Sequence, residues 1–234
     1  MSISRIVKGA RVRNNIAAGK ILGRIGSGRG SLQELSILDL IGELKKRNNG
    51  YLPSAPPVVS GGGGALTKIS KVTTVSSATT ISFSSIPATY SDLLLVIQGR
   101  SQTSALFENI HMVLNSDTST NYNSQQLNIH STTLTATETL GTAYALIGAM
   151  TGATAAAAYA GQISLELANY AATLFKKTWT ARNQFSENDS SVNTFVQTTG
   201  GMWKSTAAIS QIDITTASGG AFVDGTTAVL YGRG

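Results

Sequence analysis

The stretch Asp92-Leu-Leu-Leu-Val-Ile-Gln98 places five aliphatic residues in succession. A run of this length is typical of a buried strand and is short for a buried helix. Successive side chains of a strand point to opposite faces of its sheet, so both faces of this strand are apolar. The stretch therefore predicts a central strand that is covered on both faces.

Segments on both sides of this run alternate apolar with polar residues, the pattern of a strand with one buried face. Ile81 and Phe83 alternate with serines. The same alternation places apolar residues at Ile110, Met112, Leu114, Ile163, Leu165, Leu167, Ile212 and Ile214. Turn signals follow at residues 218–220 and 224–225. We expect a mainly β chain whose residues 65–234 form an antiparallel β-sandwich, jelly-roll-like in size.

Charge divides the chain into two unlike parts. Residues 1–50 carry ten Lys or Arg and three Asp or Glu, whereas residues 51–234 carry eight and nine. The second part therefore holds seventeen charged residues in 184, well below the roughly one quarter that is typical of globular proteins. Because such a neutral surface repels its copies only weakly, we expect it to lie against neighbours, in particular copies of the same chain.

Composition predicts four segments. Residues 1–30 are basic, rich in glycine and free of acid, and we expect an extended anchoring arm that becomes ordered only against a partner. Residues 31–50 are expected to contain one short amphipathic α-helix. Residues 51–64 form a linker that is rich in proline first and in glycine after. Residues 65–234 form the β-sandwich module.

The short helix is predicted over residues 31–47. Ser31 and Glu34 have the spacing of a capping box, in which each side chain accepts a hydrogen bond from a free backbone N–H at the helix start. An apolar stripe at helical spacing comprises Leu35, Leu38, Ile41 and Leu44. So short a helix cannot bury this stripe alone. The stripe must therefore pack on the β module, on copies of the chain or on a larger particle.

The basic arm and the helix stripe together form a candidate docking surface. Its residues are Arg5, Lys8, Arg11, Arg13, Lys20, Arg24, Arg29, Leu35, Leu38, Ile41 and Leu44. The arm is suited either to nucleic-acid phosphates or to an acidic protein surface. It lacks aromatic residues interleaved with the basic ones, which stacking on bases requires. The helix, the linker and the neutral module therefore favour docking to protein.

Residues that usually carry catalysis or hold metals are sparse. The chain has no cysteine, which excludes disulfides and thiolate metal sites. His111 and His130 are its only histidines, and we interpret both as surface residues of strands. Asp117, in the polar loop 116–121, is a single acid and too little for calcium. The glycines of residues 23–31 lack the Lys-Ser/Thr ending of a phosphate loop. We expect no enzyme activity, cofactor or metal site.

Residues 139–165 form a run that contains no Asp, Glu, Lys or Arg and is rich in Ala, Gly and Thr. The run has few of the Leu, Ile and Phe residues that drive membrane insertion, so we expect no membrane association. We interpret it instead as a flexible or partly helical excursion between strands. The role of its alanine-rich part, residues 151–160, stays open.

Several stretches of the chain resemble segments of known proteins. Near the N-terminus, Ile21-Leu-Gly-Arg24 is followed by Gly26-Ser-Gly28 and Gln33-Glu-Leu-Ser36. This segment is similar to one found near the N-terminal side of fibre-like proteins of tailed bacteriophages. The β part resembles a module of phage fibre and head-surface proteins at 81–90, 92–96, 114–122, 203–209 and 222–232. The chain thus resembles a virion surface protein, either a head decoration (cement) protein or a fibre.

The resemblance implies an accessory structural protein of the virion, assembled in the cytoplasm of the bacterial host. Such modules are usually homotrimers, so copies of the chain and a major capsid or tail attachment protein are the expected partners. We favour capsid decoration, as a cement or head-fibre protein, because a capsid lattice would hold the glycine-rich arm. A tail attachment could do the same. The alternatives are a tail-fibre, receptor-binding protein that contacts host-surface glycan and, third, a nucleic-acid-binding protein.

Overall fold

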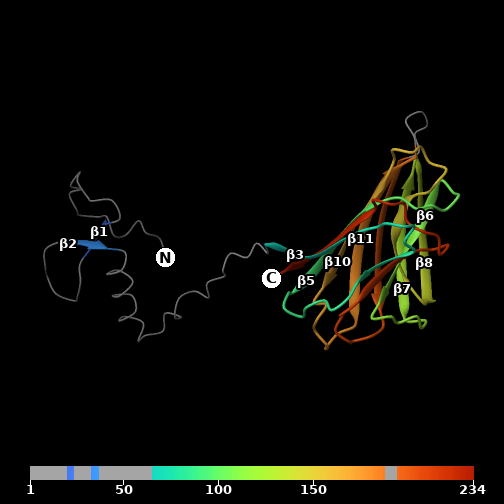
Figure 1. The fold of residues 1–234 in the computed structure, drawn as a ribbon. Helices are drawn as coiled ribbons and strands as arrows, with labels where there is room; N and C mark the ends of the chain where they lie inside the picture. The colour runs from blue at the N-terminus through green and yellow to red at the C-terminus, as the bar shows by residue number, and fades with distance from the viewer. Residues whose placement is uncertain (1–19, 24–32, 37–64, 188–193) are drawn as a thin grey trace. The chain divides into compact units, whose positions relative to one another are not determined.

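A computed structural model describes residues 20–23, 33–36, 65–187 and 194–234 of the chain. The chain divides into two compact units, Met1–Gly61 and Gly62–Gly234, and each is described by itself. Figure 1 shows the two sheets of the larger unit packed face to face. The expected antiparallel β-sandwich is confirmed, and the described residues contain no helix.

The N-terminal unit contains a two-stranded antiparallel sheet. Strand β1 (Lys20–Gly23) pairs with β2 (Gln33–Ser36), and Ile21 lies opposite Leu35. The predicted helix start at Ser31 and Glu34 is therefore wrong for residues 33–36. A capping box specifies only local geometry, and pairing with a strand 13 positions earlier overrides that local preference. The rest of the predicted helix, residues 37–47, lies outside the described residues.

The larger sheet of the second unit has eight strands, all antiparallel to their neighbours. Their order across the sheet differs from their order in the chain, so its central strands come from distant segments. The spatial order is β3 (Leu66–Thr73), β14 (Thr227–Arg233), β5 (Asp92–Gly99), β10 (Gly161–Ala168), β11 (Lys177–Ser186), β12 (Thr194–Trp203), β7 (Tyr122–His130) and β8 (Thr133–Thr142).

The smaller sheet has four strands and covers one face of the larger one. Its order is β4 (Thr80–Phe83), β13 (Ile212–Thr216), β6 (Phe107–Leu114) and β9 (Ala145–Thr151). In β4, β6 and β13 every second side chain points into the core, as the alternation around Ile81, Met112 and Ile214 predicts. The inner faces of the two sheets together form one continuous apolar core.

Strand β5 is an interior strand of the larger sheet, as its aliphatic run predicts. Its side chains are not, however, equally covered on both faces. Leu93, Leu95 and Ile97 are fully buried, whereas Leu94 and Val96 on the outer face are only partly buried. The prediction of two covered faces is therefore wrong, because the smaller sheet lies on one side only. The sequence pattern alone does not reveal that arrangement.

Residues 139–165 form strands and a loop. They comprise the end of β8, all of β9, the connection 152–160 and the start of β10. The expectation of a partly helical excursion is wrong for this segment. Among the described residues, no helix is long and apolar enough to cross a membrane. Small residues permit close packing of the two sheets: a Cβ at Gly161 of β10, for example, would lie 2.9 Å from Cα of Met150 on β9.

Candidate functional site

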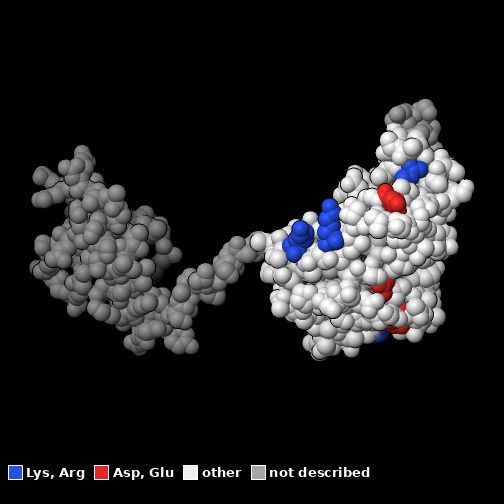
Figure 2. Space-filling model, viewed as in Figure 1, with Lys and Arg blue, Asp and Glu red and all other residues white. Residues whose placement is uncertain are grey.

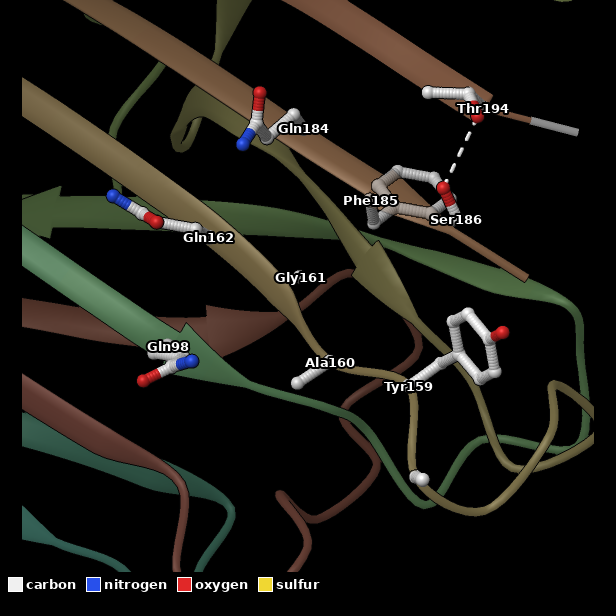
Figure 3. Close-up of a pocket in the computed structure, with 10 residues that line it drawn as sticks. Gln98, Tyr159, Ala160, Gly161, Gln162, Gln184, Phe185, Ser186 and Thr194 are labelled. Atoms are coloured by element: carbon white, nitrogen blue, oxygen red, sulfur yellow. Dashed lines mark hydrogen bonds between the residues drawn. The ribbon is translucent and has the colours of Figure 1, made fainter. Parts of the chain in front are cut away.

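A groove of about 500 Å³ opens at one end of the larger sheet, on its outer face (Figure 3). Strands β5, β10 and β11 supply its floor through Gln98, Gln162 and Gln184. The loop before β10 supplies one wall with Tyr159. On the other side, the hydroxyls of Ser186 and Thr194 lie 3.1 Å apart and are hydrogen-bonded.

The three glutamines form a row across neighbouring strands. Gln162 is directly opposite Gln98 on β5 and directly opposite Gln184 on β11. Adjacent strands lie about 4.8 Å apart, so the three amides repeat at that spacing. All three residues are exposed, and none of the three amides has a hydrogen-bond partner among the described residues. Each amide therefore offers a donor and an acceptor to a ligand in the groove.

Arg100, directly after β5, holds the alanine-rich loop that forms the groove wall. Its Nη1 donates to the carbonyls of Ala156 and Ala157, both at 2.8 Å, and to that of Tyr159 at 3.4 Å. Its Nη2 donates to the carbonyls of Gly152 at 2.7 Å and Ala155 at 2.9 Å. One guanidinium thus binds five backbone carbonyls of the loop, and those of Ala155 and Ala157 accept no other hydrogen bond among the described residues.

This arrangement accounts for the composition of residues 151–160, whose role the sequence left open. The carbonyls of this loop point inward at Arg100, so its backbone must lie close to the guanidinium. Small side chains permit this approach. At Gly152 even one methyl group is too much, since a Cβ would lie 2.2 Å from the carbonyl oxygen of Ala105. Thr151 Oγ1 also donates to the carbonyl of Tyr159, at 3.0 Å, which closes the loop at its base.

An aromatic cluster supports the groove wall beside Ser186. The ring of Phe185 stacks on that of Phe195 with centroids 4.5 Å apart. His130 stacks on the Phe195 ring at 3.9 Å, and Phe107 lies tilted against it at 5.0 Å. These ring contacts stabilise the packing between the strands that carry Gln184 and Thr194.

A second depression of about 290 Å³ continues the groove along β10 and β11. It shares Gln162 and Gln184 with the first and adds Ser164, Arg182 and Thr198. Together the two depressions offer amides, hydroxyls, one phenol ring and a single guanidinium. This set of groups suits an uncharged ligand with many hydroxyls better than a strongly charged one.

The loop of residues 116–121 has a structural role. Asp117 Oδ2 accepts hydrogen bonds from Trp203 Nε1 at 2.7 Å and from Asn121 Nδ2 at 2.8 Å, and Oδ1 accepts one from Ser119 N at 3.0 Å. These bonds, that from Asn121 first, lower the pKa of Asp117 to about 2. Because both oxygens already accept bonds from N–H groups, the carboxylate acts as an anchor between two distant segments.

Both histidines lie in strands, as predicted, but only His130 is exposed, whereas His111 is half-buried, so the surface interpretation is wrong for His111. Each histidine stacks on an aromatic ring. His111 on β6 stacks on Tyr144 with centroids 3.6 Å apart, and His130 at the end of β7 stacks on Phe195. Burial lowers the pKa of His111 to about 4, while the charge of Glu108 acts in the opposite direction. Within the described ranges, no group of three or more His, Cys, Asp or Glu is placed to hold a metal ion.

Most of the predicted docking residues lie outside the described residues: Arg5, Lys8, Arg11, Arg13, Arg24, Arg29, Leu38, Ile41 and Leu44. Lys20 lies in β1 and Leu35 in β2. Leu35 therefore belongs to a strand and not to a helical stripe. The docking surface stays a prediction from the sequence.

Sequence reasoning missed the groove altogether. The glutamines occupy polar positions in alternating strands, and each lies 22 or more positions from the next along the chain. Polar residues are expected at every solvent-facing position of a strand, so the sequence pattern does not reveal that these three glutamines lie in a row. The sequence offers only a weak indication that Arg100 has a special role: it is one of eight basic residues in residues 51–234, which are poor in charge.

Comparisons with known proteins identify no family. No family model matches the chain, and no curated protein and no solved structure matches it. The function must therefore be inferred from the residues and from the geometry of the sandwich.

Proposed function

We propose that this chain is an accessory structural protein of a tailed-phage particle. Its N-terminal residues dock it, and the sandwich of residues 65–234 is displayed on the particle surface. The observation that carries the proposal is the division of charge. The basic excess lies in the first 50 residues, whereas Figure 2 shows few charged side chains on the visible face of the second unit. The resemblance of both parts to phage surface proteins supports the same assignment.

The use of charge within the sandwich also supports a structural role. Arg100 binds five loop carbonyls, and Asp117 accepts a hydrogen bond from Trp203. Lys177 is only 3% exposed, and its ammonium donates to the carbonyls of Ala172, Phe175 and Thr206. Burial lowers the pKa of Lys177. These three charged groups stabilise loops, which is what a structural role requires of them.

Within this proposal we favour decoration of the head, as a cement or head-fibre protein. A capsid lattice offers many equivalent acidic or apolar positions to a basic, glycine-rich arm. It also brings neutral modules close to one another, which suits a surface with little charge repulsion. The localisation is then the virion, and the partners are the major capsid protein and neighbouring copies of the chain.

The anchor can be tested by sedimentation of the chain with phage particles that lack it. Changing Arg5, Arg11, Arg13, Arg24 and Arg29 together to Gln should abolish co-sedimentation, whereas changing the same five to Lys should largely preserve it. Both variants keep the sandwich, which circular dichroism of the β signal verifies. Equal binding of the Gln variant would overturn the docking proposal. Binding to free DNA with none to particles would favour the nucleic-acid alternative.

Immunogold labelling of intact particles decides between head and tail. Label over the capsid supports decoration. Label confined to the tail tip would replace it with the second candidate, a tail-fibre or receptor-binding protein.

The glutamine groove is the specific observation that favours this second candidate. Its unpaired amides and neighbouring hydroxyls match the hydroxyl groups of a neutral host-surface glycan, and Tyr159 offers a ring face. A glycan array probed with the full chain tests it. Gln162→Ala should remove binding, whereas Gln125→Ala, an exposed glutamine of β7 outside the groove, should not. Equal loss in both, or none in either, would reject the groove as the site.

A further inference from the structure

Strand β8 (Thr133–Thr142) forms one free edge of the larger sheet. It pairs with β7 on one side, and its other side has no strand partner among the described residues. Residues 133–138 are exposed on both faces of the strand, because the smaller sheet does not cover this part. A row of backbone N–H and C=O groups is therefore available for pairing with a further strand.

The opposite edge of the same sheet is protected in the usual way. Strand β3 carries Lys68 and Lys71, and its pairing with β14 is interrupted by a register shift between Leu230 and Tyr231. Lysines and irregularities of this kind discourage pairing between sheets. Strand β8 has no Lys, Arg or Pro, and Glu138 is its one charged residue. Its own register shift with β7 lies at Gly141, near its end, and leaves Thr133 to Leu140 in regular pairing. The two edges thus differ in their lysines and in the position of the irregularity, which lies inside β3 but at the end of β8.

The sequence of β8 reads nearly the same in both directions around Thr137. Threonines lie two positions away on each side, at Thr135 and Thr139, and leucines three positions away, at Leu134 and Leu140. We propose that β8 pairs antiparallel with β8 of a second copy, in the register centred on Thr137. A two-fold axis then relates the copies, and the interface is self-complementary.

This register is favoured over its neighbours by charge and by apolar contact. It places each Leu134 opposite Leu140 of the second copy, and Glu138 opposite Ala136. A register centred on Glu138 would set two carboxylates directly against each other, which is destabilising. A register centred on Ala136 would place Leu134 opposite Glu138. A register centred between two residues would set outer-face residues of one copy opposite inner-face residues of the other. A register centred on a residue avoids this and keeps the outer faces of both sheets on the same side.

The outer face next to β8 is apolar in the way that a continuing sheet requires. Leu134 lies opposite Ile129 on β7, which lies opposite Val196 on β12. These side chains are 64%, 44% and 46% exposed, and Leu140 is 61% exposed. In the proposed pair, Leu140 of the second copy extends this row at Leu134. The contact thereby covers apolar surface as well as satisfying backbone groups.

A single cysteine tests the register in the full chain, which has none of its own. Thr137→Cys places the new thiols opposite each other, at the Cα separation of about 4.5 to 5.5 Å that a disulfide accepts. Mild oxidation should convert this variant to a covalent dimer. Thr133→Cys is the matched control, because its thiols would lie about 27 Å apart at ~3.4 Å per residue. Equal cross-linking of both variants, or none at position 137, would overturn the proposal.

A charge swap tests the same pairing without covalent chemistry. Thr135→Lys with Thr139→Lys opposes two pairs of lysines and should reduce the wild-type dimer to monomers in light scattering. Thr135→Lys with Thr139→Glu places each lysine opposite a glutamate and should restore the dimer. Equal behaviour of both variants, or a monomeric wild-type chain, would overturn the inference. A trimer whose Thr137→Cys variant does not cross-link would overturn it too, in favour of the trimer that the phage resemblance implies. None of these outcomes depends on the proposed virion role.

Discussion

The indole Nε1 of Trp203 donates a hydrogen bond to Oδ2 of Asp117 across 86 positions of the chain, at 2.7 Å. Trp203 is 2% exposed, so its indole lies almost entirely out of water. The bond joins the loop after β6 to the end of β12. Asn115 lies beside it and accepts hydrogen bonds from the backbone N–H of Ser210 and Gln211 at 2.9 and 3.1 Å. The loop 115–121 and the segment 203–211 thus contact each other directly.

Removing this carboxylate should destabilise the sandwich. Asp117→Ala leaves a buried indole N–H without a partner and should lower the free energy of unfolding by about 2 to 3 kcal/mol in urea titrations. Asp117→Asn keeps an acceptor oxygen and should cost about 1 kcal/mol. A double-mutant cycle with Trp203→Phe should give a coupling energy of about 1 kcal/mol or more. Additive effects of the two changes would show that the bond contributes nothing to stability.

Stability should fall in mild acid because of His111. Its pKa is lowered to about 4 in the folded protein from an ordinary value of 6.5, chiefly by burial. The unfolded chain therefore binds a proton at a pH where the folded one does not, so stability is full above pH 6.5 and decreases as the pH falls toward 4. The loss should be on the order of 2 kcal/mol, since a tenfold change in proton affinity is worth about 1.4 kcal/mol and the ring is partly exposed.

His111→Gln removes this titration, and its stability should be nearly flat between about pH 6.5 and pH 4.5. The measured quantity is the slope of the free energy of unfolding against pH. Loss of the stack on Tyr144 lowers this free energy equally at every pH and therefore leaves the slope unchanged. A slope unchanged from wild type would assign the acid effect to other groups. Below pH 3.8 a further loss should follow as Asp117, whose folded pKa is about 2, becomes protonated first in the unfolded chain.

Arg100 should not be replaceable by lysine. The planar guanidinium reaches five carbonyls from one position, whereas an ammonium has three donors. Arg100→Lys should cost about 1 to 2 kcal/mol and expose the loop 152–160 to elastase, which cleaves after small residues. Arg182→Lys, on the outer face of β11, is the matched control and should leave the cleavage rate unchanged. Equal rates in both variants would reject the role of Arg100.

The adjacent glycines of β12 should differ in their tolerance of a methyl group. A Cβ at Gly201 would lie 2.2 Å from Cζ2 of Trp179 and 2.4 Å from the carbonyl oxygen of Asn123, whereas at Gly200 the nearest atom would be 3.7 Å away. Gly201→Ala should therefore lower stability by about 1 to 3 kcal/mol through overpacking. Gly200→Ala should change it by less than about 0.5 kcal/mol. Thermal melts of both variants check this, and an equal effect would contradict the close packing of Trp179.

The positions of the strands were largely predictable from the chain itself. Alternation around Ile81, Met112, Leu165 and Ile214 identified strands with one buried face, because the period of two is a local property of the backbone. The aliphatic run of β5 likewise identified an interior strand. The sandwich class followed from the number of such segments.

The candidate site was not predictable, for a physical reason that Gln98, Gln162 and Gln184 illustrate. Each obeys the local pattern of its own strand, but their alignment is set by the order and register of three strands that are far apart in the chain. The start of the expected helix failed similarly, because the pairing of Ile21 with Leu35 outweighed a local capping signal.

The sequence by itself determined the period of the strands, the neutral composition of the module and the basic excess of the first 50 residues. These properties depend on residues that are close in the chain. Only the tertiary structure decided which face of β5 is covered, that Arg100 organises the alanine-rich loop, and that β8 ends the sheet without a protecting lysine. Each of these depends on contacts between distant segments, whose energies no local pattern encodes.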